Sequence, residues 1–345
     1  MANTNMKKFS RAVSLMGVFS TFLAVILGCG GEGKNPVAEW TKSKKIAGKE
    51  QKLSHISGIV VDDKFAFVTI GGTVADQKEG TNGLRKVTLD TGAVTILDNG
   101  ERFPQSETGG IAIDEKYVYW NAGGNILRIA RDGGNAEVVA SEKVGIGIDL
   151  AVDNEKVYWA NHGYYSSSSP TKISPVYVVS KNGGKTEIFA DEQKGPHSLA
   201  VDEKFVYWVT PTSILKQAKT GGKVEIVYQA TNKEGVDELS QDAENLYFGF
   251  RGAGESRWDL RKISKTGGEP TTLAKRYSLK PVVVDDANVY FFNENGMSSE
   301  LLCKISKTGG EATTLDSGYS SGVITQSKTL VYFASLDDIY SFQKQ

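Results

Sequence analysis

The sequence predicts an all-β protein built from repeated four-stranded units. The main observation is a phrase in which an apolar run ends in Asp, a short turn follows, and an apolar and aromatic strand comes next, as in residues 198–208. The phrase recurs five more times with clear or weaker matches and once with an extra residue: 110–120, 149–159, 238–248 and 281–291, then 58–68 and 322–333. The copies lie about 44 residues apart, a period typical of propeller blades.

Each repeat supplies four strands in a fixed order. The first is a short run of consecutive apolar residues such as 111–113, which predicts a strand buried on both faces at the inner end of a blade. The second carries large rings such as Tyr119 and Trp120, which fill the widening wedge between blades. The third, such as 126–131, leads into a glycine-bearing hairpin that needs positive φ angles. A more polar fourth strand, such as 271–274, suits an outer edge.

The strand count predicts how the ring closes. First, second and third strands occur seven times each, but the chain ends in the third strand of the last repeat, residues 339–345. Residues 43–47 have the fourth-strand pattern, and we expect them to pair with the last blade and remove an open sheet edge. The sequence therefore predicts a seven-bladed β-propeller over residues 39–345, closed by an N-terminal strand.

An Asp recurs at the end of each first strand, with Ser327 in its place in the last repeat. The six residues are Asp62, Asp114, Asp153, Asp202, Asp242 and Asp285. Because Asp side chains accept hydrogen bonds from nearby backbone N–H groups, we interpret them as turn formers and not as catalytic carboxylates.

The repeat resembles a known class of propeller repeat. The Leu-Ala-Val-Asp phrase before Val-Tyr-Trp, with its Lys-x-Gly-Gly hairpin, is similar to YWTD-type and NHL-type β-propeller repeats, as in propeller lipoproteins and secreted proteins of environmental bacteria. The resemblance covers residues 43–345. It departs from the YWTD pattern after the aromatic pair, where Asn121 and Ala122 replace Thr-Asp, so we do not expect the side-chain network that the receptor-type repeats build on that Asp.

The first residues have the pattern of a targeting segment. A basic head precedes an apolar stretch over residues 12–27, which is typical of a signal peptide. The stretch ends in Leu-Gly-Cys and resembles the lipobox of bacterial lipoproteins, which implies that residues 1–28 are removed and that Cys29 is lipidated. Residues 29–38 would form a flexible tether. We expect a lipid-anchored protein of the cell envelope, in the outer membrane if the organism has one, because Gly30 is not the Asp that retains lipoproteins in the inner membrane; an ordinary secretory signal is the alternative.

Composition excludes several functions. Lys and Arg (40) nearly balance Asp and Glu (41), so no nucleic-acid footprint is present. Two Cys provide no disulfide framework. The letters G-x-S-x-G around Ser320 match a nucleophile elbow, but that motif requires a following helix, and a strand is predicted there. We therefore expect no catalytic residue, no cofactor and a monomer whose only membrane contact is the lipid anchor.

The longer insertions all fall on one face, formed by the loops between second and third strands and by the connections between blades. Length variation on one face is how a scaffold carries a site on loops. Candidate polar ligand-binding residues on this loop face are His55, Glu107, Asp149, His162, His197, Asp237, Glu238 and Lys280. Candidate aromatic contacts are Tyr164, Tyr165, Trp258 and Tyr319.

Two classes of function remain open. The favoured one is a noncatalytic binding or scaffold module that takes a peptide, a glycan or a partner protein on the loop face. The alternative is a lyase or hydrolase that uses His55, His162 or His197, for which the seven-bladed streptogramin lyases, with a His-containing metal site, set a precedent. Because His55 and His197 belong to blades on opposite sides of the ring, and zinc–nitrogen bonds are only about 2 Å long, we expect no tight metal site.

Overall fold

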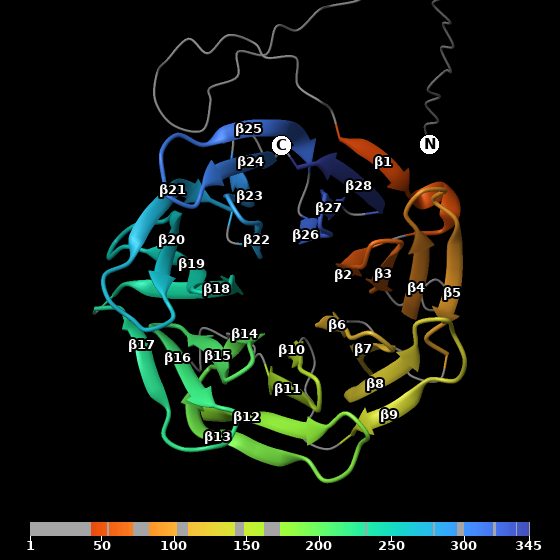
Figure 1. Cartoon of the computed structure of the whole chain (residues 1–345), viewed down its shortest axis with the longest axis horizontal. Coiled ribbons are helices and arrows are strands. Elements are labelled where there is room, and N and C mark those ends of the chain that lie inside the picture. Colours follow the sequence, from red (N-terminus) through yellow and green to blue (C-terminus); the bar gives the residue numbers. More distant parts are fainter. Residues whose placement is uncertain are drawn as a thin grey trace, which may run out of the picture.

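Seven four-stranded antiparallel blades surround a common axis in the computed structural model (Figure 1). The structure describes residues 43–53, 55–71, 83–101, 110–141, 148–161, 173–231, 233–278, 280–294, 300–319, 322–335 and 337–344. The predicted seven-bladed β-propeller is confirmed. The proposed signal peptide, Cys29 and tether lie outside the described residues, and within those residues no helix is long and apolar enough to cross a membrane.

The strands of the first six blades follow chain order from the axis outward. Blades 1 to 3 contain β2 (Ile56–Val61), β3 (Phe65–Ile70), β4 (Gly83–Thr88) and β5 (Val94–Asp98); β6 (Ile111–Ile113), β7 (Tyr117–Ala122), β8 (Asn125–Ala130) and β9 (Glu137–Ala140); and β10 (Ile148–Val152), β11 (Lys156–Asn161), β12 (Ile173–Ser180) and β13 (Glu187–Lys194). Blades 4 to 6 contain β14 (His197–Val201), β15 (Phe205–Thr210), β16 (Ser213–Ala218) and β17 (Glu225–Gln229); β18 (Gly235–Gln241), β19 (Asn245–Arg251), β20 (Trp258–Ser264) and β21 (Thr271–Tyr277); and β22 (Val283–Val284), β23 (Asn288–Glu294), β24 (Glu300–Ser306) and β25 (Thr313–Tyr319).

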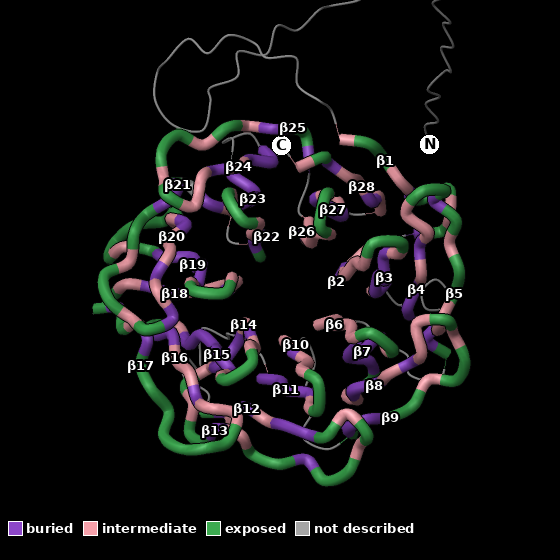
Figure 2. Tube along the Cα trace, viewed as in Figure 1, coloured by how far each residue is buried: buried purple, intermediate pink, exposed green. Residues whose placement is uncertain are grey.

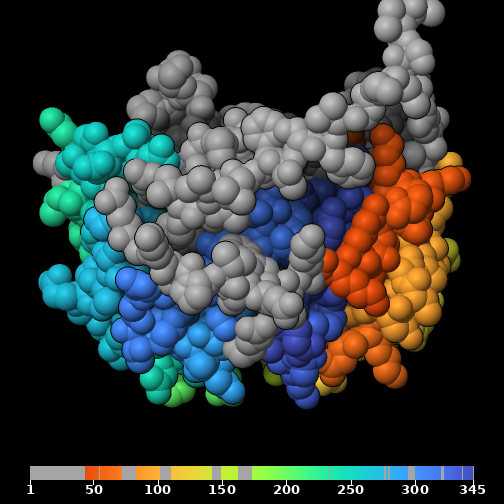
Figure 3. Space-filling model, turned by 90° about the horizontal axis from the view of Figure 1, so that it is seen from above, coloured from red at the N-terminus to blue at the C-terminus, as the bar shows by residue number. Residues whose placement is uncertain are grey.

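The seventh blade joins the two ends of the described chain. It contains β26 (Gly322–Gln326), β27 (Leu330–Ser335), β28 (Asp338–Gln343) and, as its outer strand, β1 (Lys44–Ala47), which leads into the short 3-10 helix η1 (Lys49–Gln51). Strand β1 runs antiparallel to β28, with Lys45 opposite Tyr340. Figure 3 shows β1 in orange on the surface, between the last blade in dark blue and the first blade. The predicted closing strand is confirmed.

The core is a series of layers between neighbouring blades. The rings of Trp120, Trp159 and Trp208 are fully buried, as predicted for the second strands. Phe292 of blade 6 meets Phe333 of blade 7 edge to face, with ring centroids 5.7 Å apart. Because each blade buries its rings against the next, the stability of one blade depends on its neighbours.

The first strands are less buried than the sequence predicts. Residues 111–113 of β6 are all only partly buried, and Figure 2 shows the same intermediate exposure along much of the inner end of the ring. The expectation of burial on both faces is therefore wrong for these strands. The physical reason is their place at the inner edge of each sheet: β6 contacts β2 and β10 of the two neighbouring blades, but it pairs with β7 alone, so its other edge faces the axis.

The repeated Asp residues form the turns between first and second strands, as predicted. In blade 2, Asp114 Oδ1 accepts hydrogen bonds from the backbone N–H groups of Lys116 (2.8 Å) and Tyr117 (2.7 Å). Its Oδ2 accepts a third from the hydroxyl of Tyr119 (3.0 Å). The same turn recurs at Asp62, Asp153, Asp202, Asp242 and Asp285.

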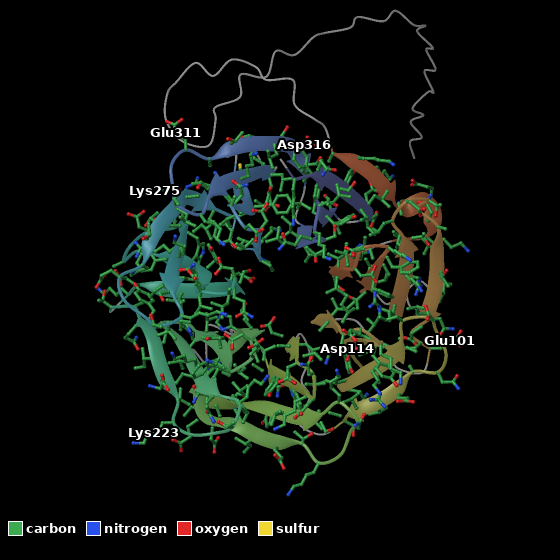
Figure 4. All side chains as sticks on the ribbon, viewed as in Figure 1. Glu101, Asp114, Lys223, Lys275, Glu311 and Asp316 are labelled. Atoms are coloured by element: carbon green, nitrogen blue, oxygen red, sulfur yellow. The ribbon has the colours of Figure 1, made fainter. Side chains whose placement is uncertain are left out.

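The same carboxylates also connect the blades. A seam is the contact between two neighbouring blades, and in five seams a basic residue after the third strand of one blade pairs with the Asp of the preceding blade. The pairs are Arg131 with Asp62, Lys181 with Asp114, Lys219 with Asp153 (2.8 Å), Lys265 with Asp202 (2.9 Å) and Lys307 with Asp242 (2.5 Å). We call these pairs the seam ladder. Figure 4 shows Asp114 inside its blade, whereas Lys223 and Glu311 point away from the ring.

Candidate functional site

Four neighbouring blades bring ionisable side chains together where their first strands begin. Asp149 lies in β10, His197 in β14, Asp237 and Glu238 in β18, and Lys280 precedes β22. Figure 1 shows β10, β14, β18 and β22 following one another around the axis. We call these five residues and Ser198 the axial cluster. Five predicted site residues thus lie in one place.

His197 is the most buried member of the axial cluster, with 2% of its surface exposed. Its Nδ1 lies 2.9 Å from the carbonyl oxygen of Gly195, and its Nε2 lies 2.9 Å from Asp237 Oδ1. A carbonyl and an ionised carboxylate only accept hydrogen bonds, so both ring nitrogens carry protons. Burial opposes this charge, but the hydrogen bond and charge of Asp237 outweigh it and raise the pKa of His197. In this state His197 has no lone pair for a substrate proton or for a metal.

Hydrogen bonds between blades hold the backbone around His197. Asp149 Oδ2 accepts from the N–H of Ser198 (2.6 Å), and Ser198 Oγ accepts from the N–H of Leu239 (2.8 Å). Ser198 (φ +47°) and Glu238 (φ +49°) both adopt left-handed backbone conformations. Such conformations persist in non-glycine residues only where the surroundings impose them, and they concentrate at functional sites. The axial cluster is therefore rigid and locally strained.

Glu238 carries an unusual carboxyl group. Burial is the main cause that raises its pKa to about 8, and the charges of Asp149 and Asp237 raise it further. The positive charges of His197 and Lys280 oppose the shift without cancelling it. At neutral pH Glu238 is therefore mainly protonated, and its carboxyl group can donate a hydrogen bond or a proton.

Lys280 and an aromatic pair lie beside the carboxylates. Lys280 Nζ is 3.5 Å from Glu300 Oε2. Burial raises the pKa of Tyr277 well above its usual value, and the charge of Glu238 adds to the shift. Tyr277 is opposite Trp258 across β20 and β21. A Cβ on Gly235, the first residue of β18, would lie 3.2 Å from the ring of Trp258, so this ring covers the start of the strand that carries Asp237 and Glu238.

The remaining predicted residues do not join the axial cluster in the part of the chain that is described. His55 is exposed in blade 1, across the ring from blade 4, and its N–H donates to Asp337 Oδ1 (2.9 Å). Tyr319 is only 9% exposed, and its ring packs against Phe333 of blade 7 with centroids 4.6 Å apart. Its ring therefore belongs to the packing between blades 6 and 7 and does not offer the exposed contact that the sequence suggested. Four predicted residues lie outside the described residues: Glu107, His162, Tyr164 and Tyr165.

Three residues of the site were not found from the sequence. Ser198 had a usable signal, because it stands four residues before its repeat's Asp, as do Asp149 and Glu238. Tyr277 and Glu300 stand at the places in their repeats that Tyr319 and Trp258 occupy in theirs, so an alignment of the copies would have found them. Among the residues that the structure describes, no three His, Cys, Asp or Glu side chains are grouped as metal ligands would be.

The comparisons with known proteins show to which fold class the chain belongs. The chain matches no protein-family model and no curated protein sequence. It is similar to the solved structure of a catalytically inactive virginiamycin B lyase from Staphylococcus aureus with quinupristin (TM-score 0.64, 14% identity, 88% of this chain and 99% of that one). It is also similar to oligogalacturonate lyase from Vibrio parahaemolyticus (0.62, 11%, 84% and 91%) and to the computationally designed Ika8 protein (0.57, 11%, 87% and 99%). At these identities the likeness shows the β-propeller fold alone.

Proposed function

We propose that the protein is a noncatalytic binding module of the cell envelope, which takes a peptide, a glycan or a partner protein at the axial cluster. The protonation of His197 carries the proposal. Both of its nitrogens are committed to Gly195 and Asp237, so it cannot act as the general base of a site built around it. The cluster instead offers fixed donors and acceptors beside the ring of Trp258, a combination suited to recognition.

Rigidity supports the same proposal. The bonds from Ser198 to Asp149 and from Leu239 to Ser198 fix three blades relative to one another at the site. A site that is already ordered loses little conformational entropy when a ligand binds. The axial cluster therefore needs no rearrangement to present its polar groups.

The binding role can be tested by probing peptide and glycan arrays with the purified protein and two variants. Asp237→Asn removes a charge from the axial cluster. Asp132→Asn is the matched control, because its side chain is 99% exposed in a hairpin turn on the opposite face. We expect ligands that are retained by the wild type and by Asp132→Asn, and that Asp237→Asn binds at least about tenfold more weakly. Equal binding by all three proteins would contradict the proposal.

Attachment to the envelope rests on the sequence of the first 29 residues. Lipidation of Cys29 would place the protein in the membrane fraction after cell lysis. Cys29→Ala is expected to release it or to leave the signal peptide uncleaved. An unchanged membrane partition and mature mass in this variant would rule out the lipid anchor.

A lyase or hydrolase is the second candidate, and Glu238 is the observation that favours it. A carboxylic acid with a pKa of about 8 is suited to donating a proton at neutral pH. Two of the similar folds above are lyases, which shows that the architecture can carry such chemistry. If the array identifies a ligand, its incubation with the wild type and with Glu238→Gln separates the candidates: a new product that forms only with the wild type would favour the enzyme.

A further inference from the structure

Two of the seven seams have no pair in the seam ladder. Between blades 6 and 7 the two positions still hold opposite charges, in Asp285 and Lys344. The seam between blade 7 and blade 1 differs from all the others.

In the seam between blades 4 and 5, Lys265 pairs with Asp202. The equivalent positions in the seam between blades 7 and 1 hold Leu89 and Ser327. Leu89 and Lys265 are structurally equivalent because their backbone N–H groups make the same hydrogen bond. The N–H of Leu89 donates to the carbonyl oxygen of the turn residue Lys64 (2.9 Å), and the N–H of Lys265 donates to the carbonyl oxygen of Glu244 (2.9 Å). In this seam, therefore, neither of the two positions holds a charged side chain.

A second basic position is lost in the same seam. Lys216 lies opposite Tyr207 in blade 4, and its Nζ donates to the carbonyl of Lys265 (3.1 Å) in the next blade. Lys86, Arg128 and Lys262 make the same contact in their seams. The corresponding residue of blade 7 is Ser341, which lies opposite Tyr332. Its short side chain cannot reach across the seam.

A cavity of about 350 Å³ lies at this seam. Ile46 of β1, Leu89 of blade 1, and Leu330 and Phe342 of blade 7 form its apolar lining, and Ser341 contributes a hydroxyl. Lys44 of β1 is the only charged side chain among the described residues that line it, and no acidic side chain does. The described residues also provide no ion pair for Lys44. The cavity thus combines an apolar wall with one positive charge. The corresponding cavity between blades 1 and 2 is about 510 Å³ and is lined by charged side chains, among them Lys86, Arg131 and Asp132, so the two differ in their lining.

We propose that this seam cavity binds a small amphipathic carboxylic acid, whose apolar body contacts Leu89, Leu330 and Phe342 and whose carboxylate pairs with the Lys44 ammonium group. Removal of apolar surface from water is the main favourable contribution. The carboxylate distinguishes an acid from an amine or an alcohol of the same length, because a cation would be repelled by Lys44. The volume is at the lower end of the range for small-molecule sites.

Binding at this seam has a mechanical consequence. The ligand would contact β1 and β28 of blade 7 and the loop after β4 of blade 1, and so connect two blades that share no seam-ladder pair. A ligand that binds only the closed ring stabilises it in proportion to the logarithm of its concentration. The site is separate from the axial cluster and does not depend on the function proposed there.

The test uses the full chain with sodium octanoate as the probe. Binding is measured by calorimetric titration and by the change in melting temperature. We expect saturable binding and a melting temperature that rises with octanoate, and no rise with octylamine. Ser341→Lys places in this seam the basic side chain that blades 1, 2, 4 and 5 carry at this position, and its chain occupies part of the space that the apolar body of the acid would take, so it should weaken binding. Lys44→Gln should weaken the affinity about fivefold, as for loss of one exposed ion pair. Lys49→Gln, an exposed lysine in the adjacent η1, should leave it unchanged.

Two kinds of outcome would overturn the assignment. Octanoate binding that is absent, or equal in Ser341→Lys and the wild type, would show that the cavity is not the site. An equal response to octylamine, or an unchanged affinity in Lys44→Gln, would remove the role of the carboxylate. Lys44→Gln changes an exposed side chain, so this comparison holds even if Ser341→Lys fails to fold.

Discussion

Glu238 makes the stability of the protein depend on pH at the scale of a single residue. Burial and the neighbouring carboxylates raise its pKa from 4.5 to about 8. Below pH 4.5 the carboxyl group is protonated in both the folded and the unfolded chain. As pH rises from 4.5 to 8 the unfolded chain releases this proton while the folded chain retains it, so stability is lost over this range.

Glu238→Gln should therefore be more stable than the wild type at pH 8, because Gln needs no proton to remain neutral. The difference in melting temperature should be small at pH 4 and should grow toward pH 8. Glu203→Gln, an exposed residue of a turn, serves as the control and should show no such trend. A constant difference across this range would contradict the pKa assigned to Glu238.

Asp237 is a second single residue with a measurable effect, because it determines the charge of His197. The hydrogen bond and charge of Asp237 raise the pKa of His197 against the effect of burial. The stability that this pair contributes is complete below the pKa of His197 in the unfolded chain, about 6.5. It is lost as pH rises through the higher pKa of His197 in the folded chain. In Asp237→Asn we expect the pKa of His197, measured from its imidazole NMR signals, to fall, and the free energy of unfolding at pH 6 to drop by about 1–3 kcal/mol. Asp132→Asn should leave the pKa of His197 unchanged and, because it loses only an exposed ion pair with Lys86, should lower the free energy of unfolding by less than about 1 kcal/mol.

The seam ladder is the recurring contact at the scale of the element. Lys265 is 9% exposed, and its ammonium group lies 2.9 Å from Asp202 Oδ2. Lys265→Met should lower the free energy of unfolding in urea by about 2 kcal/mol, because the carboxylate loses its charged partner. Lys223→Met, at an exposed lysine that points away from the ring in Figure 4, should have an effect within about 0.5 kcal/mol. Equal effects in the two variants would show that the ladder does not stabilise the seams.

The same ladder predicts sensitivity to acid. Burial alone would raise the pKa of Asp202, but the hydrogen bonds from Lys265 and from the backbone outweigh it and lower the pKa to about 2. The stability that the ionised Asp202 contributes is complete above pH 3.8, the unperturbed pKa, and is lost as pH falls toward 2. Melting temperatures measured between pH 5 and pH 2 should fall steeply in the wild type and less steeply in Asp202→Asn.

The sequence predicts the elements well because every blade meets nearly the same environment. The Asp turns and the Gly-Gly hairpins recur in each copy, and Gly133 and Gly134 have the expected positive φ angles of +101° and +124°. The connections between blades likewise located Asp149 and Glu238 on the loop face. Prediction failed at the outer ends of the fourth strands. Tyr277 and Tyr319 are the last residues of β21 and β25 and occupy the same place in their repeats, but the fourth-strand pattern stopped short of both, so Tyr319 was taken for a loop residue and Tyr277 was missed.

At the scale of the whole molecule, the ring depends on contacts between residues that are distant in the sequence. The seam between blades 7 and 1 has no seam-ladder pair, so β1 carries much of the connection between the ends of the chain. Lys45 lies opposite Tyr340, and its ammonium group is 3.0 Å from Asp338 Oδ1. Gly92 of blade 1 packs so closely on β1 that a Cβ there would lie 2.3 Å from the carbonyl oxygen of Ile46. Blade 1 therefore rests directly on the closing strand.

Deletion of residues 39–48 should consequently destabilise the whole ring and not one blade alone. Without β1, the N–H and C=O groups of β28 form an open sheet edge, which favours pairing with another copy. We expect a lower melting temperature and association detectable by light scattering. Lys45→Ala is the matched control, because it removes the ion pair with Asp338 and keeps the strand, and it should remain monomeric with a smaller loss of stability. A truncated chain that melts like the intact one would mean that the other seams alone hold the ring closed.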